Sequence, residues 1–306
     1  MAARDHAITS RDAVERRLQG GGVDWRGAVL EGLLLLSLLV SLGVLLVLLA
    51  DTLLKALPVL LDRPGEFMTS PLSARAARAG IVQAIIGSLT VTLLVIVLAM
   101  PIGIASAIYL EEYSKDSRLA RFIRTNIRNL AGVPAIVYGL LGLAVFSTAL
   151  GLGSTALAGG LTLAILVLPI VVITTMEALS AVPSSIREAA FGVGATRWET
   201  IRSHVLPYAA PGVLTGTILS LARAFGETAP LLMVGAIAGT FSFVGAPWEQ
   251  LFEGYTTLPT IIYHWAGYPQ DEFRALSAAA IVVLLVVILL ANATAIILRN
   301  RYDRTW

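Results

Sequence analysis

The feature that most limits the fold of this sequence is a series of long apolar runs with few or no charges. A helix needs about 20 apolar residues to cross a hydrocarbon core. The runs are 32–50, 80–110, 129–176, 208–238 and 275–298. Only 14% of the 306 residues are charged, compared with roughly 25% in soluble domains. The pattern therefore predicts an integral membrane protein and argues against a water-soluble enzyme.

The run 129–176 is too long for one crossing, and the turn-forming segment 151–160 interrupts it. We therefore divide it into two spans, which brings the total to six. The sequence predicts an all-α integral membrane protein with six transmembrane helices. A polar tail, 1–27, precedes a six-helix transmembrane domain, 28–300, and we detect no internal repeat of spans.

The distribution of basic residues predicts the orientation of the chain. Sixteen Lys and Arg residues lie in the N-terminal tail, in the loops after spans two and four, and at the C-terminus, whereas five lie in the opposite loops. Basic residues are retained on the cytoplasmic side of a membrane. We therefore expect both termini to be cytoplasmic, in a multi-pass protein of the plasma membrane.

The sequence lacks the residues that several kinds of chemistry require. The only lysines, Lys55 and Lys115, are not preceded by the glycine of an ATP-binding P-loop. The chain has no cysteine, and its three histidines match no zinc-ligand spacing. A scattered net charge of +2 does not suggest nucleic-acid binding. We predict a non-enzymatic chain with no catalytic residue, no metal site and no cofactor of its own.

The predicted cytoplasmic segment 183–207 contains two helix-start signals. Ser185 with Glu188, and Thr196 with Glu199, have the spacing of a capping box. Gly192 and Gly194 would break the chain between two short helices, and Pro207 would end the second. The apolar face expected on this segment consists of Ile186, Ala189, Ala190 and Val193. That face would suit a partner protein, but an ordinary amphipathic loop, in which Glu188 only caps a helix, fits the pattern as well.

This segment resembles the EAA motif of ABC importer permeases. The residues in register are Glu188, Ala189, Ala190, Gly194, Leu206 and Pro207. His204 departs from the motif, which has isoleucine there. The resemblance implies a MetI-like architecture and a coupling loop, with Arg187 beside the motif, that inserts into a partner ATPase. It also implies that the partner, and not this chain, binds ATP and Mg²⁺.

The second informative segment carries two charges inside predicted span five. Arg223 and Glu227 are four residues apart, which would place them on one helical face. A charge at a helix centre in a membrane costs about 2.5–3.5 kcal/mol on insertion scales, so such residues usually face a polar pathway. A self-neutralising pair that only fastens two helices is the structural alternative.

The two side chains suit recognition of a tetrahedral oxyanion. The arginine fork can bind two oxygens at once. The carboxylate of Glu227 can accept a hydrogen bond from a protonated phosphate hydroxyl, whereas it repels fully ionised sulfate. We therefore predict a substrate path formed by Arg223, Glu227 and the adjacent Thr228.

The segment 223–230 is similar to the Arg-Ala-x-Gly-Glu-Thr-Ala-Pro signature of the PstA family of phosphate permeases. Residues 131–140 resemble a second element of that family, with Ala135 in place of its usual serine. The similarity extends over residues 80–298 and implies a subunit of an ATP-driven phosphate importer in the bacterial inner membrane. The implied partners are a second permease of the PstC type, an ATPase dimer of the PstB type and an external phosphate-binding protein of the PstS type.

Other functions are compatible with parts of the pattern. An importer of sulfate, molybdate or phosphonate would carry a similar coupling loop. An ion-coupled secondary transporter could use Glu227 as a proton carrier, although such transporters usually contain inverted repeats. An intramembrane enzyme could use Glu227 as a base, but no nucleophile or metal set accompanies it.

Overall fold

The computed structural model describes residues 25–114, 117–236 and 248–302, and the regular elements in these ranges are helices. Five of these helices are long and apolar enough to cross a membrane, and a sixth crossing results if one bent pair counts as a single span. The all-α membrane fold predicted from the sequence is therefore confirmed. The chain divides into two compact units, 1–54 and 55–306, which are described separately.

The first long helix, α2, extends from Trp25 to Asp62. It contains predicted span one, 32–50, but continues through Asp51 and Lys55, whose spacing of four favours a helix. Its leucine and valine side chains from Val29 to Leu49 are exposed on all sides of the helix, as expected for a segment that lipid or another helix covers. Residues 1–24 of the predicted tail lie outside the described residues.

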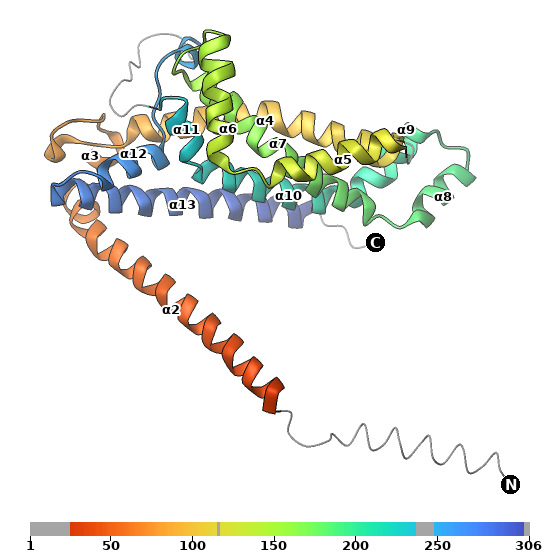
Figure 1. The fold of residues 1–306 in the computed structure, drawn as a ribbon, viewed down its shortest axis with the longest axis horizontal. Coiled ribbons are helices and arrows are strands. Elements are labelled where there is room, and N and C mark those ends of the chain that lie inside the picture. The colour runs from red at the N-terminus through yellow and green to blue at the C-terminus, as the bar shows by residue number, and fades with distance from the viewer. Residues whose placement is uncertain (1–24, 115–116, 237–247, 303–306) are drawn as a thin grey trace. The chain divides into compact units, whose positions relative to one another are not determined.

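Four long helices form the bundle of the second unit (Figure 1). They are α4 (Val82–Ile108), α7 (Ala156–Ser180), α10 (Leu206–Gly226) and α13 (Asp271–Tyr302). The order of packing is α4 on α7, α7 on α10 and α10 on α13. Predicted spans two, four and six are confirmed as α4, α7 and α13.

Small residues allow these helices to approach closely. A Cβ atom at Gly212 of α10 would lie 2.8 Å from the Cβ of Ala178 on α7. One turn further along, a Cβ atom at Gly216 would lie 2.5 Å from the Cβ of Thr174. Without a hydrophobic driving force between helices in lipid, such close packing is the main source of their association.

Predicted span three is not a straight helix. The chain forms α5 (Arg118–Ala131) and then α6 (Ala135–Gly142) with the π-helical turn η3 (Leu143–Ala149), and the two parts meet at 99°. Pro134 causes the bend, because a continued helix would leave the carbonyl of Leu130 without a donor. The Tyr138 hydroxyl donates to that carbonyl at 2.9 Å. The bend is thus built into the structure and hydrogen-bonded.

The predicted turn 151–160 is shorter than expected. Gly151 and Gly153 have positive φ angles of 68° and 65°, and α7 already begins at Ala156. Thr155 caps this helix, since its hydroxyl accepts from the backbone N–H of Ala158 at 3.3 Å. The cap moves the start of the fourth span forward into the segment that we had predicted as turn.

Predicted span five, 208–238, is wrong at both ends. The helix is continuous from Arg197 to Gly226, through α9 (Arg197–Thr200), the π-helical turn η4 (Ile201–Val205) and α10. Pro207 lies inside it, because the wider π-helical turn accommodates the missing N–H. The helix ends at Gly226, since Pro230 could not donate to the Gly226 carbonyl and its ring would clash there. Residues 237 and 238 lie outside the described residues.

Short elements cover one end of the bundle. They are α3 (Pro64–Thr69), η1 (Ala76–Arg78), α11 (Ala229–Met233), η5 (Glu249–Phe252) and α12 (Leu258–Ala266). Phe67 of α3 and Trp265 of α12 are buried in one apolar cluster with the start of α4 and the first turns of α13. The Ser88 hydroxyl of α4 accepts from the backbone N–H of Leu258 at 2.8 Å, which fixes the start of α12 on the bundle.

The contact between α7 and α10 generates a prediction. Gly216→Val should lower the melting temperature of the detergent-solubilised chain, because overpacking a close contact costs about 1–3 kcal/mol. The same enlargement at Gly32, where a Cβ would meet nothing within 4 Å, serves as the control. Equal melting temperatures for the two variants would contradict the close packing.

Candidate functional site

The first candidate site is the break between α10 and α11, residues 223–230. Glu227 follows the last residue of α10 and has an extended backbone, with φ −72° and ψ 128°. Thr228 is the N-cap of α11 and makes no side-chain capping hydrogen bond. Two residues, Glu227 and Thr228, thus separate the two helices at a point where the sequence predicted one continuous span.

The structure brings Arg223 and Glu227 together in a different way from the one that their spacing predicted. Arg223 lies in the last turn of α10, whereas Glu227 has left the helix, so the two do not share a helical face. Arg223 Nε still contacts Glu227 Oε1 at 3.2 Å, and the side chains are 52% and 17% exposed. Among the described residues, no acceptor binds the two terminal nitrogens of Arg223. The end of the guanidinium is therefore available to a ligand.

The opposite side of the break is tightly packed. Ala224 and Leu231 are buried in the apolar cluster formed with α4, α6 and α7. The cavity beside them has a volume of about 10 Å³, which is no more than one water molecule requires. Its lining includes Ser88, Leu163 and Thr257. A phosphate-sized anion has no room there, and the exposed face that carries Arg223 is the accessible side of the break.

The two segments that carry the sequence resemblance meet at this break. A Cβ atom at Gly139 of α6 would lie 2.7 Å from the Cα of Pro230 and 2.9 Å from the Cβ of Met233. Only glycine permits this approach of the bent α5–α6 element to α11. Residues about 90 positions apart in the chain therefore form one structural unit around the helix break.

The second candidate site is the loop 183–207. Its first helix, α8, extends from Ser184 to Gly192 with Pro183 as N-cap and no side-chain capping hydrogen bond. The predicted capping box of Ser185 and Glu188 is wrong, because α8 begins two residues earlier than a Ser185 N-cap would require and Ser185 lies inside its first turn. The predicted capping box of Thr196 and Glu199 is confirmed at the start of α9.

The turn between the two helices depends on Gly194. This residue has φ +85°, whereas Gly192 has ordinary helical geometry. The N–H of Ala195 donates to the Ala190 carbonyl and the N–H of Gly194 donates to the Phe191 carbonyl, both at 3.0 Å. These two bonds are a Schellman motif, which ends a helix with a left-handed residue.

The loop exposes only part of the apolar face predicted for it. Ala190 is buried and Ile186 is half-buried on the inner side of α8, whereas Ala189 and Val193 point outward, Val193 with 85% exposure. Glu188 is exposed beside Ala189. Phe191 and Trp198 add two further exposed aromatic rings. This outer surface can contact another protein.

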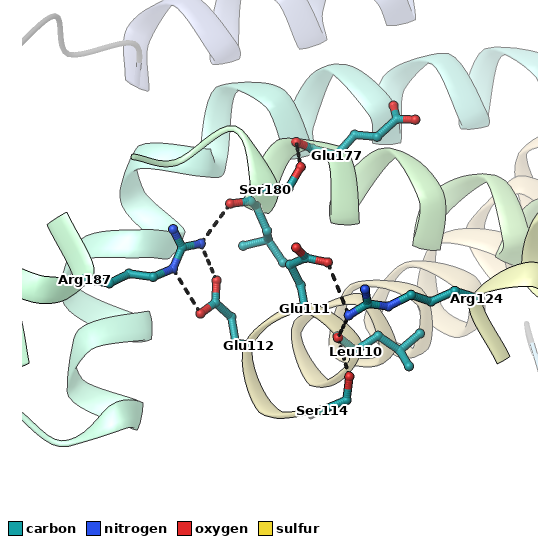
Figure 2. A network of polar contacts seen from close by, with 9 residues as sticks. Leu110, Glu111, Glu112, Ser114, Arg124, Glu177, Ser180 and Arg187 are labelled. Carbon is teal, nitrogen blue, oxygen red and sulfur yellow. Dashed lines mark hydrogen bonds and ion pairs between the residues drawn. The ribbon is translucent and has the colours of Figure 1, made fainter. Parts of the chain in front are cut away.

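Arg187 and Pro207 do not belong to the outer surface in the way that the sequence suggested. Pro207 is exposed but lies within the continuous helix from Arg197 to Gly226. Arg187 turns inward and forms an ion pair with Glu112, as Figure 2 shows. Sequence analysis missed Glu112. The available signal was the pair of carboxylates, Glu111 and Glu112, that follows the long uncharged run 80–110.

Comparison with protein families gives a match over most of the chain. The model of the family described as "Binding-protein-dependent transport system inner membrane component" matches residues 99–304. A "Phosphate transport system permease protein PstA" of Xylella fastidiosa is 34% identical over 231 residues, which is 74% of this chain and 78% of that protein. A "Probable ABC transporter permease protein YqgI" of Bacillus subtilis is 34% identical over 172 residues, 56% of this chain and 58% of that protein.

Comparison with solved structures supports the same fold. The structure of the MetNI methionine ABC transporter in an inward-facing conformation gives a TM-score of 0.61 at 20% identity. The match covers 73% of this chain and 96% of the solved chain. The MetI-like architecture implied by the sequence resemblance is therefore confirmed at the level of the fold.

The loop generates a second prediction. Gly194→Ala should make the connection between α8 and α9 more sensitive to limited proteolysis, because a left-handed backbone costs a non-glycine residue about 1–2 kcal/mol. Gly192→Ala is the matched control, since its backbone is helical and a Cβ there meets nothing within 4 Å. Similar cleavage rates in the two variants would contradict the role assigned to the Gly194 conformation.

Proposed function

The chain belongs to the family of binding-protein-dependent transport system inner membrane components, and on that premise we propose that it is the permease subunit of an ATP-driven phosphate importer. It spans the inner membrane several times and performs transport, while a partner ATPase binds ATP and Mg²⁺ and hydrolyses the nucleotide. Membership of this family argues against the ion-coupled secondary transporter and the intramembrane enzyme considered above.

The observation that carries the proposal is the exposed guanidinium of Arg223 at the break in a membrane helix. A charged side chain in contact with lipid is costly, so it requires a polar pathway or a protein partner. Glu227 engages only Nε, and the two terminal nitrogens can form a bidentate contact with two oxygens of a phosphate ion. The segment 223–230 also carries the signature that resembles that of phosphate permeases.

The route for the anion follows the exposed face of the break. The cavity lined by Ala224 and Leu231 beside it has a volume of about 10 Å³, which is too small for phosphate, so the anion would pass outside the helix bundle of this chain. A second permease subunit of the PstC type would cover that face and complete an enclosed pathway. An external phosphate-binding protein of the PstS type would deliver the ion to its outer end.

One continuous helix connects the candidate ATPase contact to the candidate substrate path. It begins after the capping box at Thr196 and ends at Gly226, three residues beyond Arg223. Its 30 residues correspond to about 45 Å at the usual helical rise. The outer surface around Glu188 and Ala189 would contact the ATPase dimer of the PstB type. Movement of that surface would then shift the position of Arg223 through a rigid element.

Substitution of Arg223 tests the substrate path. In a reconstituted complex, Arg223→Ala and Arg223→Lys should both abolish most phosphate uptake, since lysine keeps the charge but lacks the bidentate geometry. Uptake of labelled phosphate and copurification of the partner subunits are the measurements. Arg274→Ala is the control, because Arg274 forms a similar pair at 3.4 Å with Asp271, whose side chain is 93% exposed. Normal uptake by the Arg223→Ala variant would assign that residue a structural role.

Glu227 should determine selectivity. Glu227→Gln should relax discrimination against sulfate, because the neutral amide no longer repels a fully ionised anion. The measurement is the inhibition of labelled phosphate uptake by increasing sulfate, compared with the unsubstituted complex. An unchanged inhibition curve would remove Glu227 from the selectivity mechanism. Inhibition by sulfate, molybdate or phosphonate in the unsubstituted complex, stronger than by phosphate, would identify another oxyanion as the substrate.

A further inference from the structure

Arg187 forms an unusually complete set of contacts for a residue on a cytoplasmic loop. Its Nε and one terminal nitrogen bind the two carboxylate oxygens of Glu112 at 3.3 and 2.6 Å. The same terminal nitrogen donates to the Leu179 carbonyl at 2.9 Å, and the other donates to the Val182 carbonyl at 2.8 Å. All three nitrogens of the guanidinium are therefore occupied within the chain.

Glu112 is the buried member of this arrangement. Its side chain is 8% exposed, compared with 22% for Arg187. Glu112 lies in η2 (Tyr109–Tyr113), the π-helical turn that extends α4. A π-helical turn changes the direction of the side chains that follow a regular helix, and such turns are frequent at functional positions. Here the turn places a carboxylate within reach of α8 (Figure 2).

The ion pair joins three elements that are separate in the sequence. Glu112 belongs to the end of α4, the two carbonyls lie at the end of α7 and in the residues after it, and Arg187 belongs to α8. The carbonyl groups at the end of α7 carry the negative end of the helix dipole, which favours the guanidinium as the carboxylate does. Ile186 packs against the apolar cluster at the same junction, which includes Val182 and Val205.

A second, longer pair lies on the other side of the same turn. Arg124 of α5 contacts Glu111 at 3.7 Å and also donates to the Leu110 carbonyl. The Glu111 side chain is 22% exposed, and its contact lacks the two-point geometry of Glu112 and Arg187. The neighbouring glutamates of η2 thus differ clearly in burial and in the elements that they connect.

We propose that Glu112 is a positioning residue that holds α8 to the cytoplasmic ends of α4 and α7, so that loop 183–207 and both helices move as one body. This inference rests on the proposed function, because the movement of interest is the one that the ATPase imposes on the loop. The covalent chain already connects α8 to α7 and to the helix that begins at Arg197. The pair with Glu112 adds α4, which the chain does not connect directly to the loop.

The physical argument is one of geometry and exposure. A two-point contact between planar groups fixes both distance and orientation. A partly buried pair is screened by salt less than a surface pair is. Loss of the carboxylate would leave the guanidinium with two carbonyl partners and no counter-charge, which should loosen α8 without removing the residues that contact the ATPase.

Glu112→Gln tests this inference in the complete complex reconstituted in liposomes. We expect phosphate uptake per ATP hydrolysed to fall by about tenfold, within the range reported for residues that carry coupling between sites. The ATPase and the second permease should still copurify, and ATP hydrolysis should continue. Glu111→Gln is the matched control, since it removes the neighbouring carboxylate and should leave the ratio within about twofold of the unsubstituted value. An unchanged ratio in Glu112→Gln would overturn the inference.

A cross-linking experiment separates positioning from general damage. The chain contains no cysteine, so Glu112→Cys with Arg187→Cys introduces the only two thiols in this subunit. We expect the double variant to be uncoupled and a bifunctional thiol reagent of suitable length to restore coupling. A monofunctional reagent should not restore it. If cross-linking stops transport that the double variant still performs, α8 and α4 move relative to each other and the proposal is wrong.

Failure of the proposed function would give a different result. If the unsubstituted complex does not accumulate phosphate, the assignment of substrate fails. The positioning role of Glu112 is then measured from ATP hydrolysis in response to the loaded binding protein. A response that is lost in Glu112→Gln, retained in Glu111→Gln and recovered on cross-linking supports the role of Glu112. A response that Glu112→Gln retains would overturn it.

Discussion

The structure depends on one constraint: inside a membrane, backbone and side-chain polar groups must find partners within the protein, because lipid offers none. Two prolines illustrate this constraint. Pro134 has no N–H to donate to the Leu130 carbonyl, which accepts instead from the Tyr138 hydroxyl at 2.9 Å and from the Val133 N–H at 3.0 Å. Pro230 likewise has no N–H to donate to the Gly226 carbonyl, and α10 ends at Gly226. The two irregular points contact each other through Gly139 and Pro230, so the bend and the break form one unit.

This unit explains how a charge can be carried on the surface of an apolar helix bundle. A regular helix in lipid would expose Arg223 to hydrocarbon, whereas the break gives it Glu227 as a partner on one side and an open approach on the other. At the other end of the same continuous helix, loop 183–207 is held by a Schellman turn, a capping box and the ion pair of Arg187. The candidate substrate path and the proposed ATPase contact thus lie toward opposite ends of one continuous helix.

Prediction from the sequence succeeded where a single local rule decides the outcome. Run length and the absence of charge located α4, α7 and α13, and the Thr196–Glu199 spacing identified a real capping box. Prediction failed where two local rules compete. Pro207 was expected to end a helix, but a π-helical turn accommodates it. Ser185 was expected to cap a helix that begins one residue earlier. Arg223 and Glu227 were correctly paired, but for the wrong geometric reason.

By itself, the sequence determined that the chain crosses a membrane and which segments carry the family resemblance, because transfer of charge into lipid and the conformational limits of proline and glycine act on local sequence. The side that the basic loops face stays a prediction from the same local charge pattern. Only the tertiary structure decided that Glu112 is buried against Arg187, 75 residues away, and that Gly139 packs on Pro230. Burial and long-range pairing depend on how helices pack, and no periodicity along the chain records which residues meet across two separate helices.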